Sequence, residues 1–151
     1  MIQRIDHVNL VVENMPAMIA FYQDLLGLRP TKRATISGRW IQSVTGLPRV
    51  EADVVFLEAP HGPGIELIQY RSPAGLRPAG LGDPTTQGLR HIAFRVADLD
   101  ALVAAMKGAG VEFGSEIQLV PSAQVDFADQ RKRLVYCRDP EGNLLELCAF
   151  A

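Results

Sequence analysis

Two histidines and two glutamates stand at matched positions in distant parts of the sequence, and all four are residue types that bind metal ions. His7 and His91 are 84 residues apart, and Glu66 and Glu146 are 80 residues apart. Imidazole nitrogens together with carboxylate oxygens suit a divalent cation, and four protein ligands leave room for water or a substrate. The pattern therefore predicts one working metal site with these four residues as its protein ligands.

The four residues belong to a repeat within the chain. The segment 5–12 (IDHVNLVV) resembles 89–96 (LRHIAFRV), and the segment 60–67 (PHGPGIEL) resembles 140–147 (PEGNLLEL). Chance produces one such match easily, but two matches in the same order at nearly the same offset indicate a duplicated unit. Each half opens with a histidine-bearing strand and ends with a turn that leads into a glutamate-bearing strand.

The repeat predicts two modules, at residues 1–70 and 89–151, joined by a Gly- and Pro-rich linker at 71–88 within one compact domain. Periodicity and turn residues predict strands at 4–12, 28–39, 51–58, 64–70, 89–96, 111–119, 132–138 and 144–150. Helices are expected at 15–26 and 98–107, capped by Asn14 and Asp98. Each module thus reads β-α-β-β-β. The predicted fold class is α+β: paired modules forming a curved mixed sheet that makes a cup, with the helices outside.

Alternation along the strands sends all four candidate ligands to the concave face. Side chains two residues apart share a face of a strand, and the apolar neighbours of each ligand point to the helix side. A carboxylate on a mainly apolar strand is costly to bury without a positive partner, and two carboxylates brought together repel. A shared divalent cation removes both costs. The same face carries four side chains expected to contact the substrate: Asn9, Tyr70, Arg95 and Cys148.

These residues also have ordinary structural interpretations. A single strand histidine is more often structural than a ligand, and a single glutamate more often pairs with an arginine such as Arg95; the symmetry of the set reverses those odds. Arg95 either holds a substrate carboxylate or phosphate or forms an ion pair with one of the glutamates.

Other conspicuous side chains are expected to have ordinary structural roles. His61 is expected in a surface turn, Arg131-Lys132-Arg133 at a solvated strand edge, and Cys137 and Cys148 as reduced core thiols. Arg39-Trp40 and Phe127 are expected in irregular stretches that close over the cup or simply pack.

Composition excludes several classes of partner. The chain has 151 residues, a net charge of -2 and 48% hydrophobic residues, as an ordinary globular protein does. No basic run suits nucleic acid or an anionic membrane, no apolar stretch approaches the length of a membrane span, and no signal peptide is visible. A cytoplasmic protein acting on a small molecule is expected.

The motifs resemble those of the vicinal oxygen chelate superfamily, which contains glyoxalase I, methylmalonyl-CoA epimerase, extradiol dioxygenases and the fosfomycin and bleomycin resistance proteins. The matching motifs are Ile5-Asp6-His7-Val8, Phe21-Tyr22-x-x-Leu25-Leu26-Gly27-Leu28, Gly88-Leu89-Arg90-His91-Ile92-Ala93-Phe94 and Asp139-Pro140-Glu141-Gly142-Asn143-Leu144-Leu145-Glu146-Leu147. The resemblance implies a metal held between two β-α-β-β-β modules. Position by position, it implies the ligand set His7, Glu66, His91 and Glu146, which is similar to that of bacterial glyoxalase I and close to that of the epimerase.

The resemblance implies a metal-dependent isomerase, epimerase or glyoxalase-type lyase acting on a small substrate. In this expectation Ni, Co, Zn or Mn polarises a carbonyl, and Glu146 or Glu66 carries the proton. Two alternatives stay open: an Fe(II)-dependent dioxygenase, and a non-catalytic ligand-sequestering protein of the antibiotic resistance type. Residues that would bind glutathione or coenzyme A are not recognisable, so the substrate is left open. A homodimer is expected because members of the superfamily often dimerise.

Overall fold

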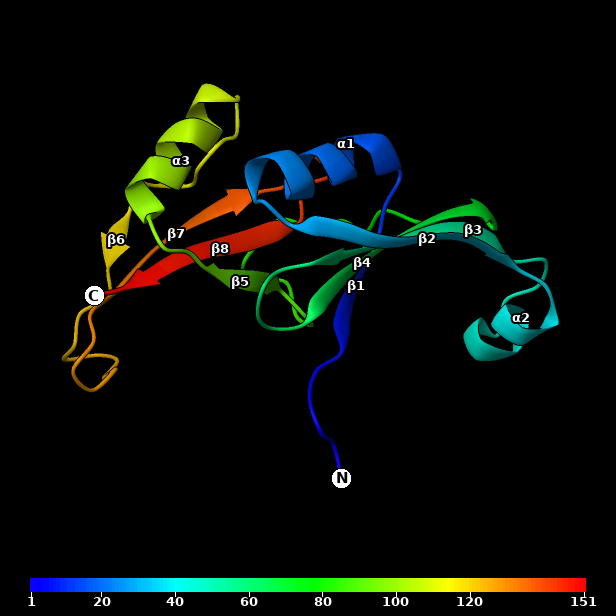
Figure 1. The fold of residues 1–151 in the computed structure, drawn as a ribbon, viewed down its shortest axis with the longest axis horizontal. Helices are drawn as coiled ribbons and strands as arrows, with labels where there is room; N and C mark the ends of the chain where they lie inside the picture. The colour runs from blue at the N-terminus through cyan, green and yellow to red at the C-terminus, as the bar shows by residue number, and fades with distance from the viewer. The chain divides into compact units, whose positions relative to one another are not determined.

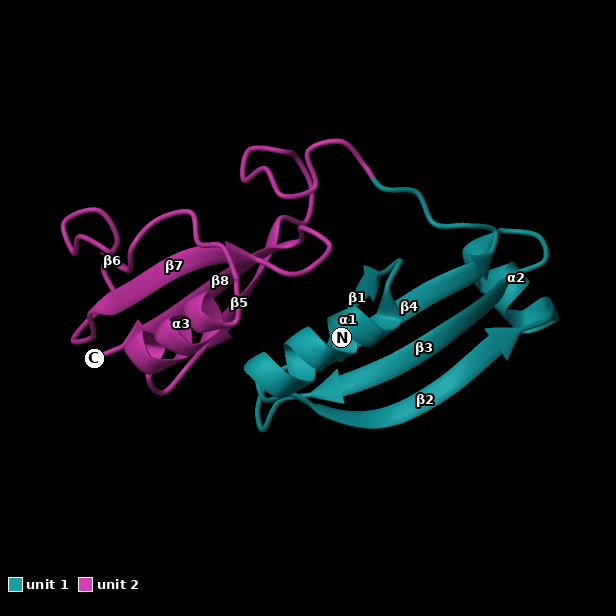
Figure 2. Ribbon diagram, turned by 90° about the horizontal axis from the view of Figure 1, so that it is seen from above, with its two compact units in different colours: residues 1–77 teal, residues 78–151 magenta.

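The chain forms the same arrangement of strands and a helix twice in succession (Figure 1). A computed structural model describes residues 1–151. The chain divides into two units, Met1–Arg77 (unit 1) and Pro78–Ala151 (unit 2), coloured separately in Figure 2. The division falls inside the stretch expected as a linker. None of the helices combines the length and the apolar character needed to cross a membrane.

Unit 1 contains a four-stranded mixed sheet in the order β1-β4-β3-β2. Strand β1 runs parallel to β4, and the remaining neighbours are antiparallel. Its elements in chain order are β1 (His7–Val11), α1 (Met15–Ala20), a π-helical continuation (Phe21–Leu25), β2 (Arg29–Ser37), α2 (Arg39–Thr45), β3 (Glu51–Glu58) and β4 (Gly64–Ser72). The side chain of Asn14 accepts a hydrogen bond from Ala17 N, which confirms the predicted cap.

Unit 2 repeats this topology, with strand order β5-β8-β7-β6 and β5 parallel to β8. Its elements are β5 (His91–Arg95), α3 (Leu99–Gly108), β6 (Gln118–Leu119), β7 (Lys132–Arg138) and β8 (Leu144–Phe150). Asp98 caps α3 by accepting from Ala101 N at 2.9 Å, as predicted. Two mixed four-stranded sheets with three helices confirm the predicted fold class.

Two predicted elements were wrong. Arg39 and Trp40 were expected in an irregular stretch, but they begin α2, a two-turn helix that buries Ile41. A strand was expected over 111–119, but only β6 forms there, together with one isolated bridge between Phe113 and Cys137. Gly114 interrupts that segment, and a glycine within a short edge strand weakens pairing.

The strand register is the same in both units, so residues that match in the sequence repeat occupy matching positions in the two sheets. In unit 1, Asn9 lies opposite Glu66, and in unit 2, Ala93 lies opposite Glu146. Each histidine stands two positions before that pair on its own strand, so histidine and glutamate share a face. The strands start at the histidines because the parallel partner in each unit also begins there: His7 is opposite Gly64, the first residue of β4.

A buried carboxylate shapes the turn that leads into β8. Asp139 is only 4% exposed, and its Oδ1 accepts hydrogen bonds from Glu141 N (3.0 Å) and Asn143 N (2.9 Å). Its Oδ2 accepts from the Asn143 side-chain amide at 2.8 Å. This turn fixes where β8 begins, and therefore where Glu146 stands relative to its neighbours.

We predict that Asp139→Ala lowers the free energy of unfolding by about 2 to 4 kcal/mol, because it leaves three part-buried donors without this acceptor. Urea unfolding followed by circular dichroism measures the loss. The control is Asp83→Ala, which removes an exposed aspartate that accepts from Thr85 N and Oγ1. Its loss should be much smaller, and equal losses in the two variants would contradict the prediction.

Candidate metal-binding site

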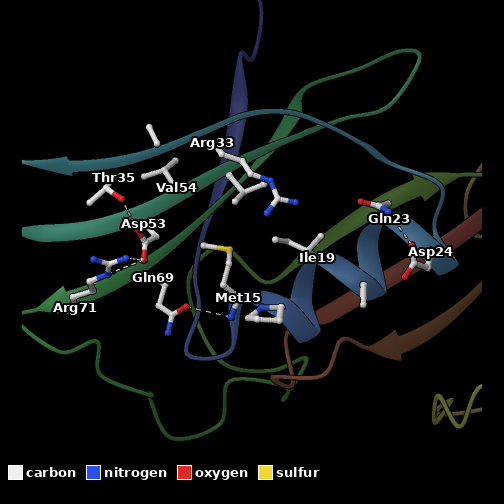
Figure 3. A pocket seen from close by; sticks show the side chains of 14 residues that line it. Met15, Ile19, Gln23, Asp24, Arg33, Thr35, Asp53, Val54, Gln69 and Arg71 are labelled. Carbon is white, nitrogen blue, oxygen red and sulfur yellow. Dashed lines mark hydrogen bonds and ion pairs between the residues drawn. The ribbon is translucent and has the colours of Figure 1, made fainter.

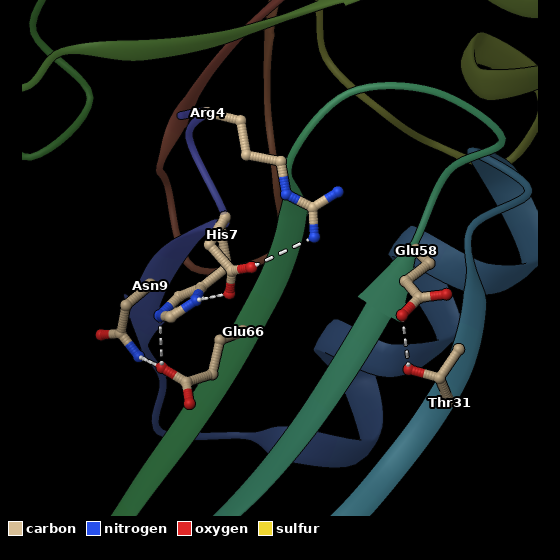
Figure 4. A network of polar contacts seen from close by, with 7 residues as sticks. Arg4, His7, Asn9, Thr31, Glu58 and Glu66 are labelled. Carbon is tan, nitrogen blue, oxygen red and sulfur yellow. Dashed lines mark hydrogen bonds and ion pairs between the residues drawn. The ribbon is translucent and has the colours of Figure 1, made fainter. Parts of the chain in front are cut away.

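The first histidine and glutamate lie together in unit 1 (Figure 4). His7 Nε2 is 3.5 Å from Glu66 Oε2, and the Asn9 amide donates to the same oxygen at 2.7 Å. The other ring nitrogen, His7 Nδ1, lies 3.0 Å from Asp6 Oδ2. An ionised carboxylate only accepts hydrogen bonds, so Nδ1 is the donor in this contact, and Nε2 is the nitrogen that faces Glu66.

The hydrogen bond from His7 holds the pKa of Asp6 below its ordinary value of 3.8. The Asp6 carboxylate is therefore ionised at neutral pH and orients the imidazole. A carboxylate behind a histidine, on the side away from the metal, is a common outer partner of metal-binding histidines. Asp6 is a functional candidate that sequence reasoning did not single out, although it immediately precedes His7.

The second histidine and glutamate form a matching pair in unit 2. His91 Nε2 is 3.5 Å from Glu146 Oε2, and the Glu146 side chain is 5% exposed. The His91 ring packs against Tyr136, with 5.3 Å between ring centroids. Ala93 stands where unit 1 has Asn9, so no amide reaches this glutamate from β5. A different residue neutralises Glu146.

That residue is Lys132, whose Nζ is 2.5 Å from Glu146 Oε1. The contact is a charge pair, because no donor meets this buried oxygen in good hydrogen-bonding geometry. Burial of Lys132 favours the neutral amine, but Glu146 outweighs it and raises the pKa of the lysine above 10.5. Lys132 also lies over the rings of Phe127 and Phe150, at 5.8 and 5.9 Å from their centroids.

The expectation of a solvated strand edge at 131–133 was wrong for Lys132, whose side chain is 17% exposed. It was right for Arg131, which is exposed, and for the Arg133 side chain, which is 41% exposed and pairs with Asp100 at 2.7 Å. The missed signal was alternation along β7. Lys132 shares its face with Tyr136, and Tyr136 lies opposite Glu146 in the antiparallel register. The even spacing of Lys132 and Tyr136 along β7 therefore already places the lysine on the face of the sheet that carries Glu146.

The donor geometry fits a divalent metal ion. A cation about 2.1 Å from a nitrogen and an oxygen holds these two atoms about 3.0 to 3.4 Å apart, depending on the coordination angle. Both His–Glu pairs have a separation of 3.5 Å, so small rotations bring each pair into ligand positions. Each unit supplies two such donors, and neither unit holds a group of three or more metal-ligand side chains by itself.

The four predicted substrate contacts have different surroundings. Asn9 donates to Glu66 and thereby supports a predicted ligand. Tyr70 packs against the cluster formed by Ala52, Val54 and Ile68. Arg95 lies with its Cζ 4.6 Å above the Phe150 ring, and the cation paired with Glu146 is Lys132 rather than Arg95. Cys148 is a buried neighbour of Glu146.

Unit 1 also has a groove of about 880 Å³ on the helix side of its sheet (Figure 3). Met15 and Ile19 of α1 line one wall. On the sheet side, Arg71 donates to Asp53 at 2.8 Å, and Thr35 donates to the same carboxylate at 2.7 Å. These charges already neutralise each other, and no histidine or cysteine lines the groove. It therefore lacks the donors of the His–Glu pairs.

The chain is similar to known proteins along nearly its whole length. The sequence model of the Glyoxalase/Bleomycin resistance protein/Dioxygenase superfamily matches residues 4–147. The uncharacterized protein YaeR of Escherichia coli K12 is 28% identical over 146 residues, covering 97% of this chain and 95% of YaeR.

Solved structures of glyoxalase family proteins are also similar to this chain. A glyoxalase family protein from Bacillus cereus has a TM-score of 0.84 and 28% identity, with 99% of this chain and 95% of that chain covered. The trypanothione-dependent glyoxalase I of Leishmania major has a TM-score of 0.66 and 21% identity, with 97% and 86% covered. At 21% identity, the similarity to the Leishmania major protein shows a shared fold and no more.

The thiols of unit 2 give a test of the structure around Glu146. Burial raises the pKa of Cys137 to about 11, and burial also raises the pKa of Cys148. At pH 8 only about one molecule in a thousand carries the Cys137 thiolate, and both sulfurs are shielded from solvent.

We predict that the native protein reacts with a thiol reagent such as DTNB at pH 8 at least about a hundredfold more slowly than the urea-unfolded protein. Unfolding should release two reactive thiols per chain, since both cysteines are free. Rapid labelling of one thiol in the native protein would show that the β7–β8 core is open.

Proposed function

The chain belongs to the glyoxalase/bleomycin resistance protein/dioxygenase superfamily, and from this membership we propose that it is a metal-dependent isomerase, epimerase or glyoxalase-type lyase. The proposed reaction removes a proton next to a carbonyl of a small substrate and returns it to the substrate. One observation carries the proposal: each unit presents a histidine Nε2 and a glutamate Oε2 at 3.5 Å, at equivalent positions of equivalent sheets.

The proposed metal ligands are His7, Glu66, His91 and Glu146, two from each unit. A divalent ion bound there, Ni, Co, Zn or Mn, supplies Lewis-acid polarisation of a substrate carbonyl. The outer contacts support these roles, because Asp6 orients His7 and Asn9 holds Glu66. A set of two imidazoles and two carboxylates is larger than the two-histidine, one-carboxylate set typical of Fe(II) oxygenases.

In this proposal the two glutamates have different roles, Glu146 as a metal ligand and Glu66 as the proton acceptor. Glu146 is almost fully buried, and protein groups face both of its oxygens. Glu66 is 18% exposed, and its protein partners all reach Oε2, so Oε1 is left for solvent or substrate. Glu66 is therefore the carboxylate with room to accept a proton and return it, while Glu146 acts as a fixed ligand. General base catalysis by a positioned carboxylate accelerates such a step by about 10² to 10⁴-fold.

Arg95 is the proposed contact for an oxyanion of the substrate. It lies on the same face of β5 as His91, because the two residues are four positions apart and side chains an even number of positions apart share a face of a strand. Its guanidinium carbon lies 4.6 Å from the centroid of the Phe150 ring, and the planar guanidinium suits a carboxylate or phosphate of the substrate. Tyr70 and Cys148 are proposed as lining residues of the same faces. We also propose a homodimer, the common assembly in the superfamily.

We predict that the protein binds one divalent ion per chain, and that His91→Ala or Glu146→Gln weakens binding by at least about a hundredfold because each removes a ligand. Titration with Zn²⁺ in competition with a chromophoric chelator measures the affinity. His61→Ala is the matched control, since His61 is exposed and lies in a turn. Absence of binding by the wild-type protein would contradict the proposed site, and so would an equal loss in His61→Ala.

We predict that Glu66→Gln slows exchange of solvent deuterium into the carbon next to the substrate carbonyl by about 10² to 10⁴-fold, because the amide cannot take the proton. The measurement is NMR of a panel of 2-oxo and 2-hydroxy acids and thiohemiacetals with the metal-loaded protein. Asn9→Asp is the companion variant, because it keeps an oxygen-bearing side chain beside Glu66 while removing the amide donor. Oxygen uptake with Fe(II) would instead indicate a dioxygenase. Tight ligand binding without exchange would indicate a sequestering protein.

A further inference from the structure

The two oxygens of Glu146 face different partners within unit 2. Oε2 faces His91 Nε2 at 3.5 Å, and Oε1 faces Lys132 Nζ at 2.5 Å. The first oxygen is the proposed metal ligand, and the second is already beside a positive charge. Because the carboxylate is 5% exposed and the lysine side chain 17% exposed, water screens this pair only weakly.

The lysine is specific to unit 2. At the equivalent position in unit 1, opposite Tyr70 as Lys132 is opposite Phe150, the chain has Ala52. Glu66 is held there by the neutral amide of Asn9. The duplicated unit has therefore diverged at the charge beside its glutamate.

Two aromatic rings lie near the same ammonium that contacts Glu146. Lys132 Nζ is 5.8 Å from the Phe127 centroid and 5.9 Å from the Phe150 centroid, and these two rings pack edge to face. An ammonium over aromatic faces is stabilised without a carboxylate. Lys132 can therefore give up Glu146 and remain on the same face of the sheet.

We propose that Lys132 is a built-in counter-cation of Glu146, which neutralises the carboxylate in the metal-free chain and competes with the divalent ion for it. This inference rests on the proposed metal site. Without the ammonium, a buried carboxylate has no compensating charge, and this is strongly unfavourable. With a divalent ion bound, the ammonium becomes a like charge a few ångströms away, and it opposes binding. Lys132 is thus a positioning residue that stabilises the empty site and weakens the loaded one.

The test compares Lys132→Met with the wild-type protein in two measurements. Metal affinity is measured with Zn²⁺ alone by chelator competition, and metal-free stability by urea unfolding. We expect Lys132→Met to bind Zn²⁺ at least about tenfold more tightly and to unfold at lower urea when metal-free. Lys132→Gln, which keeps a donor for Oε1 but removes the charge, should show the same gain in affinity with a smaller loss of stability. It serves as the readout if the methionine variant folds poorly.

Two further variants separate charge from packing. Lys132→Arg keeps the charge and should bind Zn²⁺ within about threefold of wild type. Lys32→Met is the matched control in unit 1, because Lys32 also lies 5.8 Å from a phenylalanine centroid, that of Phe56, but contacts no carboxylate. It should change neither measurement.

The outcomes distinguish this inference from the proposed function. Failure of the wild-type protein to bind Zn²⁺ overturns the metal site and the competition together. Binding by the wild-type protein, with unchanged or weaker affinity in both Lys132→Met and Lys132→Gln, overturns the competition alone and leaves the metal site intact. A purely structural lysine would lower stability without tightening metal binding.

Discussion

A negative charge buried on an apolar strand is the constraint around which unit 2 is arranged. Glu146 lies on β8, a central strand on which four of the other six residues are buried, so little water solvates its carboxylate. The hydrogen-bonded turn at Asp139 sets the start of that strand. Lys132 reaches the carboxylate from β7, and His91 faces it from β5. Each of the two strands beside β8 therefore contributes one side chain that contacts the buried carboxylate.

Unit 1 meets a weaker form of the same constraint. Glu66 is partly exposed, and a neutral amide from β1 is sufficient to hold it. The imidazole in this unit is oriented from behind by Asp6, whereas the equivalent residue in unit 2 is Arg90, which has no acceptor to offer. The backbone was conserved between the two halves, while the polar groups around each His–Glu pair diverged. Symmetry of the fold thus coexists with asymmetry of charge.

The sequence predicted the parts of the molecule that depend on local pattern. Alternation assigned the faces of the strands, and polar residues before apolar runs located the caps at Asn14 and Asp98. It did not predict α2, because seven residues carry too little periodicity to distinguish a short helix from a loop. It also missed the role of Lys132, because the lysine's partner is set by the pairing of β7 with β8 and by the reach of a long side chain.

The difference between the two glutamates matters for the kind of chemistry that the pairs can support. A site with two equivalent carboxylates has no reason to use one rather than the other as a base. Here the Lys132 ammonium and nearly complete burial restrict Glu146 in the metal-free chain, whereas Glu66 is more exposed and is held by a neutral amide. A carboxylate that must leave its resting position to accept a proton works best where that movement breaks few contacts. The differences at Asn9 and Ala93, and at Ala52 and Lys132, thus give the two glutamates different surroundings on otherwise equivalent strands.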